Sequence, residues 1–141
     1  MTDSFDLHRF VAAQDAGGTY ERALGELRAG HKTSHWMWFV FPQLTGLGHS
    51  AMSRRYGISS VAEARAYLDD PVLGPRLREC ARALDGLSGV SAQDVLGAVD
   101  ALKLRSSMTL FAAADPGELL FTSVLDRYFG GRPDPATERI L

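Results

Sequence analysis

Apolar residues return every three or four positions along most of the chain, which is the spacing of helices that bury one face. The segment PVLGPRLRECARALDGL (71–87) shows this pattern clearly. Its apolar stripe comprises Leu73, Leu77, Cys80, Ala81, Leu84 and Leu87. Strict alternation of apolar and polar residues, which would indicate strands, is scarce, and only WMWFVF (36–41) could form one. The pattern therefore predicts an all-α fold of six to eight short to medium helices.

Capping and glycine signals place the first two helices. Asp3 or Ser4 can cap a short helix over residues 5–11. Thr19 can cap a second helix, which we expect to close at Gly30 because glycine adopts the left-handed conformation after a helix at little cost. The two glycines before Thr19 separate these helices.

Serine, proline and glycine signals bound the later helices. Ser60 with Glu63 predicts a capping box, and Ser91 with Asp94 predicts a second helix cap. The helix after Ser91 is expected to turn four apolar residues toward the core: Val99, Leu102, Leu110 and Phe111. The segment PGELLFTSVLDRYFGG (116–131) predicts a last long helix, and the tail after it one further turn.

Length and charge narrow the class of protein to which the chain can belong. The 141 residues favour one domain over 1–141, large enough to bury a core without metal or disulfide. The net charge of −2 makes nucleic acid an unlikely partner. The single cysteine, Cys80, favours a reducing, cytoplasmic location. The N-terminus carries no apolar signal region, and the run 36–41 is far shorter than the roughly 20 residues that span a bilayer, so we expect a soluble protein without a membrane partner.

The stretch GHKTSHWMWFVFPQL (30–44) is the first candidate site. Its candidate residues are Lys32, Ser34, His35, Trp36, Trp38 and Gln43. If a helix starts at residue 33 or 34, its free amides lie beside Lys32 and can bind phosphate or carboxylate, while the tryptophan faces offer stacking surface. In the alternative interpretation the apolar residues, with Met37 and Val40 facing inward, are core, and the polar residues are caps and links.

The stretch KLRSSMTLF (103–111) is the second candidate site. Its candidate residues are Lys103, Arg105, Ser106, Ser107 and Thr109. Helical spacing puts Lys103 one turn from both serines, and a cation with hydroxyls on one face is a reasonable contact set for an anion. The alternative is a solvated helix face, or hydroxyls that bond back to the preceding turn.

Other chemistries have weaker support. His31 and His35 have metal-ligand spacing, but no Glu lies between them and Gly30 breaks the helix, so no metal site is expected. Cys80 lies on an apolar stripe, where a thiol is usually inert. No local group would build an oxyanion hole for a serine activated by Lys103. The residues indicate no particular cofactor.

Four stretches carry a resemblance to a known family. These are SHWMWFVFPQL, GLGHSAMSRRYGISSVAEARAYL, PVLGPRLREC and KLRSSMTLF. Over nearly its whole length the chain resembles an uncharacterised family of small, mainly α-helical bacterial and fungal proteins, a domain of unknown function that genomes often label calpastatin. The resemblance implies an all-α domain and marks both candidate stretches as family signatures, but it implies no reaction. The label conflicts with composition, because a calpastatin is a polar, largely disordered chain.

The two candidate stretches together predict one shared pocket. We expect Lys103 and His35 to hold an anionic group, the serines to donate hydrogen bonds, and Trp36 or Trp38 to stack. A phosphate-bearing small molecule of nucleotide or ADP-ribose type suits that set. Two alternatives stay open: a hydrolase or transferase with His35 as acid or base, and a protein-interaction module that docks a partner on an aromatic patch of Trp36, Trp38 and Phe39. In a further alternative the polar residues only satisfy buried backbone groups.

Overall fold

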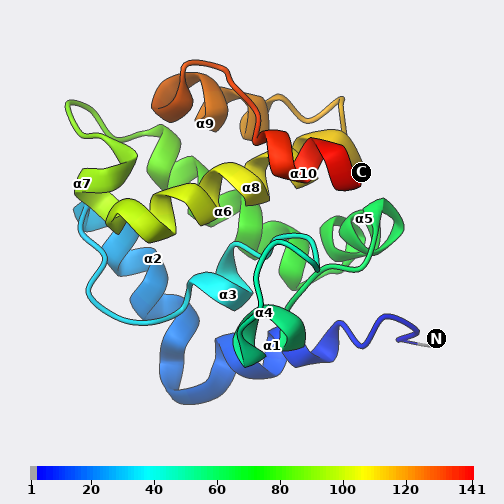
Figure 1. Ribbon diagram of the computed structural model, residues 1–141. Coiled ribbons are helices and arrows are strands. Elements are labelled where there is room, and N and C mark those ends of the chain that lie inside the picture. The colour runs from blue at the N-terminus through cyan, green and yellow to red at the C-terminus, as the bar shows by residue number, and fades with distance from the viewer. Residues whose placement is uncertain (1–2) are drawn as a thin grey trace.

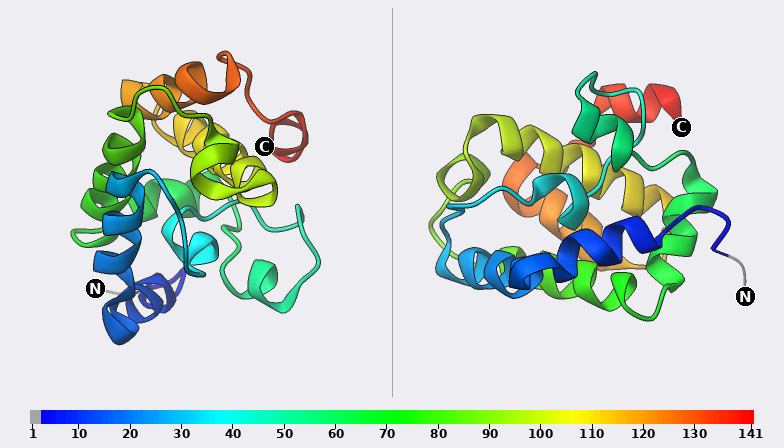
Figure 2. Two further views of the ribbon diagram at one scale, coloured as in Figure 1. Left: turned by 90° about the vertical axis from the view of Figure 1, so that its left-hand side faces the viewer. Right: turned by 90° about the horizontal axis from the view of Figure 1, so that it is seen from below.

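A long central helix organises the molecule. The computed structural model describes residues 3–141. Its helices are α1 (His8–Asp15), the 3₁₀ turn η1 (Ala16–Gly18), α2 (Thr19–Ala29), α3 (Met37–Val40), α4 (Ala51–Arg55), α5 (Val61–Asp69), α6 (Leu73–Asp85), α7 (Ala92–Leu96), α8 (Ala98–Ala114), α9 (Leu119–Phe129) and α10 (Pro135–Ile140). Helix α8 packs against α5, α7, α9 and α10, and α6 packs against α2, α5 and α9. Figures 1 and 2 show α1 and α9 on opposite sides of the molecule, with α6 and α8 between them.

A series of aromatic rings connects these layers through one continuous core. The ring of Phe10 in α1 lies 5.1 Å from that of Tyr67 in α5. Tyr67 lies 5.4 Å from Phe111 in α8, and Phe111 lies 5.9 Å from Phe121 in α9. All four side chains are fully buried. Tilted and edge-on aromatic pairs of this kind add about 0.5–1.5 kcal/mol each beyond their buried area.

The all-α, single-domain prediction is confirmed, and several helix ends lie where local signals place them. The Asp3 carboxylate accepts the amide hydrogens of Leu7 and His8 at 2.6 and 2.9 Å. It thus holds the first turn of α1, although this helix begins at His8 and not at the expected residue 5. Helix α2 closes at Gly30, which is left-handed with φ 75°. Ser91 forms the complete capping box of α7. Ser60 accepts the amide hydrogen of Glu63 as predicted. The capping box expected there is incomplete, because Glu63 accepts from the amide of Ser59 and not from that of Ser60.

Two local predictions are wrong. Thr19 does not cap α2; its hydroxyl donates to the carbonyl of Ala16. Val99 and Leu102 do not line the core, since 68% and 64% of their surface is exposed. Gly97, with φ 86°, ends α7 and starts α8. Because the helix is interrupted there, the packing of α8 itself decides which of its residues face the core. That packing buries the face of Leu104, opposite Val99 and Leu102.

The glycine at position 97 also explains one of the helices that residues 3–141 form beyond the six to eight expected. One predicted segment becomes α7 and α8, and residues 37–40 form a separate single turn, α3. In the described residues 3–141 no strand forms, and the one β-bridge joins Leu44 to Ile58. None of the helices in that range is long and apolar enough to cross a membrane.

Candidate functional site

One carboxylate shapes the first candidate stretch. Glu26 of α2 accepts the amide hydrogens of Thr33 and Ser34 at 2.8 and 3.1 Å, the Ser34 hydroxyl at 2.5 Å and the Trp36 indole N–H at 2.9 Å. Burial raises the pKa of Glu26, but these hydrogen bonds outweigh it and lower the pKa to about 2. The helix expected to begin at residue 33 or 34 begins only at Met37, so those free amides serve Glu26 and not a ligand.

A second carboxylate joins the two candidate stretches. Asp100, in the first turn of α8, accepts Lys32 Nζ at 2.9 Å and Lys103 Nζ at 3.2 Å. Only 8% of the Lys32 side chain and 18% of the Lys103 side chain are exposed. Burial raises the pKa of Asp100, but hydrogen bonds from the two lysines outweigh that effect, so the net shift is downward. The backbone fixes Lys32 as well, because its amide donates to the carbonyl of Val95 at 2.8 Å.

Each lysine also lies over a tryptophan ring. Lys103 Nζ lies 3.6 Å from the ring centre of Trp38, and Lys32 Nζ lies 5.1 Å from that of Trp36. Both distances allow a cation–π attraction, which strengthens when the cation is partly desolvated. The two predicted stretches are therefore in contact through Asp100.

These residues line one small cavity, which we call the lysine cavity. It has a volume of about 60 Å³. Its lining residues are Lys32, His35, Trp36, Met37, Trp38, Asp100 and Lys103. Five of the eleven candidate residues therefore share a cavity, while Asp100, which completes it, was missed by the sequence analysis. A signal for Asp100 exists, since it precedes Lys103 by one helical turn.

Three candidates on α8 face away from the lysine cavity. Arg105 donates to the carbonyls of Arg132 and Pro133, both at 2.9 Å. The Ser106 hydroxyl donates to Asp134 at 3.2 Å, and the backbone amide of Asp134 donates to the Thr109 hydroxyl at 2.8 Å. Arg105, Ser106 and Thr109 thus fasten the C-terminal segment to α8.

The remaining candidates, Ser34, Gln43 and Ser107, do not line the lysine cavity. Ser34 is bonded to Glu26 as described above. Gln43 lines a separate hollow of about 10 Å³, together with Trp38 and Tyr56. Ser107 is fully buried, and its hydroxyl has no hydrogen-bond partner among the described residues. Although it follows Lys103 by one helical turn, Ser107 does not line the lysine cavity.

The geometry gives little support to the two alternatives to a binding pocket, the protein-interaction module and the hydrolase or transferase. Trp36 is fully buried and Phe39 is 8% exposed, so the aromatic patch proposed for docking a partner protein is not at the surface. Trp38 is half-buried. Within residues 3–141 no side chain forms a hydrogen bond with the exposed His35, so no group orients its ring as an acid–base catalyst requires.

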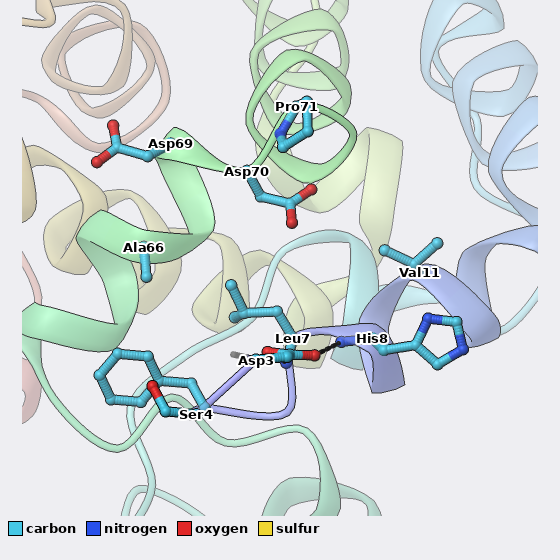
Figure 3. A pocket seen from close by; sticks show the side chains of 10 residues that line it. Asp3, Ser4, Leu7, His8, Val11, Ala66, Asp69, Asp70 and Pro71 are labelled. Atoms are coloured by element: carbon cyan, nitrogen blue, oxygen red, sulfur yellow. Dashed lines mark hydrogen bonds between the residues drawn. The ribbon is translucent and has the colours of Figure 1, made fainter. Parts of the chain in front are cut away.

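A larger hollow lies far from these residues along the chain, between the N-terminal segment and the corner that joins α5 to α6 (Figure 3). Its volume is about 540 Å³. We call it the N-terminal cavity. No local pattern in the sequence predicts this cavity, because its walls combine residues 3–11 with residues 66–71.

The fold and the arrangement of the site define a small all-α protein whose two signature stretches meet on the central helix. A model of the family described as "Protein of unknown function (DUF1810)" matches residues 4–141, and the chain belongs to this family. Among solved structures, the conserved hypothetical protein Rv1873 from Mycobacterium tuberculosis is 51% identical, with a TM-score of 0.95 over 99% of this chain and 98% of that chain. A comparison with curated proteins gave no match. The predicted resemblance to a domain of unknown function is confirmed.

Proposed function

We propose that the protein binds an anionic small molecule through one phosphoryl or carboxylate group placed in the lysine cavity. The supporting observation is the pair of largely buried ammonium groups of Lys32 and Lys103, which share the single carboxylate of Asp100. Each ammonium group has three N–H donors, and hydrogen bonds to Asp100 leave donors free on both. With one carboxylate for two lysines, the cluster keeps a net positive charge. The region thus offers both charge and directed donors to an anion.

The size of the lysine cavity limits what it encloses. A volume of about 60 Å³ exceeds the roughly 30 Å³ that a water molecule occupies in the liquid. It falls below the roughly 300 Å³ at which pockets begin to enclose a whole drug-sized ligand. A nucleotide or ADP-ribose type ligand would therefore place one phosphate in the cavity and keep the rest outside, beside His35 and Trp38. His35 would supply a further donor.

Tryptophan fluorescence tests this proposal directly. Trp36 and Trp38 are the only tryptophans in the chain, and both line the lysine cavity. We expect phenyl phosphate to change the emission, and benzyl alcohol, its neutral control, to leave it unchanged. Lys103→Met should weaken phenyl phosphate about tenfold or more, because a hydrogen bond between charged groups contributes about 1.5–3 kcal/mol. Arg54→Gln is the matched control, since Arg54 is exposed on α4 and forms no ion pair within residues 3–141.

A second variant separates binding from a purely structural role. If the anion and Asp100 compete for the same lysines, Asp100→Asn should bind phenyl phosphate several times more tightly than the wild type. If the lysines only hold residues 31–36 to α8, Asp100→Asn lowers stability and phenyl phosphate affects neither protein. That outcome would overturn the proposal, as would an equal loss of affinity in Lys103→Met and Arg54→Gln.

A further inference from the structure

The N-terminal cavity has room for a whole small molecule. Its volume of about 540 Å³ lies within the roughly 300–1,000 Å³ of small-molecule sites. Much of its wall is apolar. The apolar lining residues are Phe5, Leu7, Val11, Ala66 and Pro71. They come from the N-terminal segment, α1 and the corner between α5 and α6, so the fold itself builds the concave surface.

Most of the charged groups around this apolar wall are negative. Asp3, Asp69 and Asp70 all line the cavity, and its described lining contains no lysine or arginine. His8 is the remaining titratable group. None of the three aspartates forms an ion pair with a described residue, although seven such pairs occur elsewhere in residues 3–141. A concave surface lined by carboxylates raises the local concentration of cations.

Asp70 is the carboxylate best placed to contact a ligand. Its Oδ1 accepts the amide hydrogens of Val72 and Leu73 at 2.9 and 3.0 Å, which fixes the side chain at the start of α6. No described residue donates to its Oδ2. Figure 3 shows this carboxylate directed into the space that Val11 faces from α1, whereas Asp69 points away from it. On the opposite wall, the backbone amides of Leu7 and His8 hold the carboxylate of Asp3.

We propose that the N-terminal cavity binds an organic ammonium ion with an apolar body. The ammonium group would donate to Asp70 Oδ2, and the body would lie against Leu7, Val11 and Ala66. A charged group and apolar surface on one ligand match a carboxylate above an apolar wall. An anion would meet the carboxylates of Asp70 and Asp3 there. This site is separate from the lysine cavity, and the opposite ligand charge distinguishes the two proposals.

Three probes of one shape test the charge requirement. Phenethylammonium carries the cation, 2-phenylethanol is its neutral control, and 3-phenylpropionate is its anionic control. In amide NMR spectra we expect phenethylammonium to shift the signals of Val11, Ala66 and Asp70, 2-phenylethanol to do so more weakly, and 3-phenylpropionate to have no effect there. Equal shifts from all three probes, or shifts from phenethylammonium only outside the cavity, would overturn the proposal.

Two variants test the contacts. Asp70→Asn keeps the helix cap, because asparagine caps as well as aspartate, but removes the charge. It should weaken phenethylammonium about three- to tenfold and leave 2-phenylethanol unchanged. Ala66→Phe should fill the cavity and remove binding of both probes. Asp126→Asn, an exposed carboxylate on α9, is the control and should change neither. Unaltered binding in Asp70→Asn or in Ala66→Phe, with an unchanged melting temperature, would contradict the assignment.

Discussion

A single carboxylate, Glu26, decides the local structure of the first signature stretch. It satisfies two backbone amides, one hydroxyl and one indole N–H from residues 33–36. Hydrogen bonds to a charged group are stronger than neutral ones, so this one side chain replaces the cap that a helix in this stretch would need. As a result, Ser34 acts as a structural donor, and Lys32 and His35 are the polar residues of the stretch that line the lysine cavity.

The lowered pKa of Glu26 predicts a pH-dependent contribution to stability. Its pKa falls from 4.5 to about 2 in the folded protein. The ionised carboxylate therefore stabilises the fold above about pH 4.5, and this contribution is lost as the pH falls toward 2. We expect Glu26→Gln to lower the free energy of unfolding by about 2 kcal/mol at neutral pH and by clearly less at about pH 2.5. Urea unfolding at both pH values measures this, with Asp126→Asn as the control. The same loss at both pH values would contradict the assignment.

Helix α8 divides the second signature stretch between two tasks. Lys103 and Ser107 face one side, where Lys103 meets Asp100 and Trp38. Arg105 and Thr109 face the other side and hold the segment that leads into α10. Residues one turn apart share a face, whereas residues two apart point in nearly opposite directions, so one continuous stretch serves both surfaces.

The anchoring of α10 predicts a local effect of Arg105. Its guanidinium donates to two carbonyls just before the helix, at 2.9 Å each. We expect Arg105→Met to speed amide hydrogen exchange in residues 134–140 while the melting temperature changes little, because the core under α8 is untouched. Arg139→Met, on an exposed position of α10 itself, is the control. If exchange increases equally in both variants, or throughout the chain in Arg105→Met, Arg105 is not the local anchor.

At the scale of the whole molecule, Phe111 is the centre of the core. Its ring contacts Tyr67 of α5 and Phe121 of α9, and so joins helices on both sides of α8. A packed interior relaxes only partly around a deleted side chain, which makes such a central position costly to truncate.

This position predicts a large loss of global stability. Phe111→Ala should lower the free energy of unfolding by about 3–5 kcal/mol, a substantial part of the roughly 5–15 kcal/mol typical of a domain. Leu119→Ala, at a position that is 74% exposed, should change it little. Thermal and urea unfolding of the two variants measure the difference. A loss below about 1 kcal/mol in Phe111→Ala would contradict the central role of this ring.

The sequence by itself determined the features that depend on neighbours three or four residues apart. The apolar stripe of α6, the capping box at Ser91 and the glycine stop at Gly30 are all of this kind, because one helical turn brings their partners together. It also singled out the two stretches that carry the lysines and tryptophans of the lysine cavity.

The tertiary structure alone decided which long-range partners these residues meet. It gave Lys32 and Lys103 the same carboxylate, Asp100, turned Arg105 toward the C-terminal segment, and joined residues 3–11 to residues 66–71 around the N-terminal cavity. Local periodicity says that a helix has a buried face, but not which helix will cover it. That choice depends on the packing of all the helices at once, and it fixes where the charges and cavities lie.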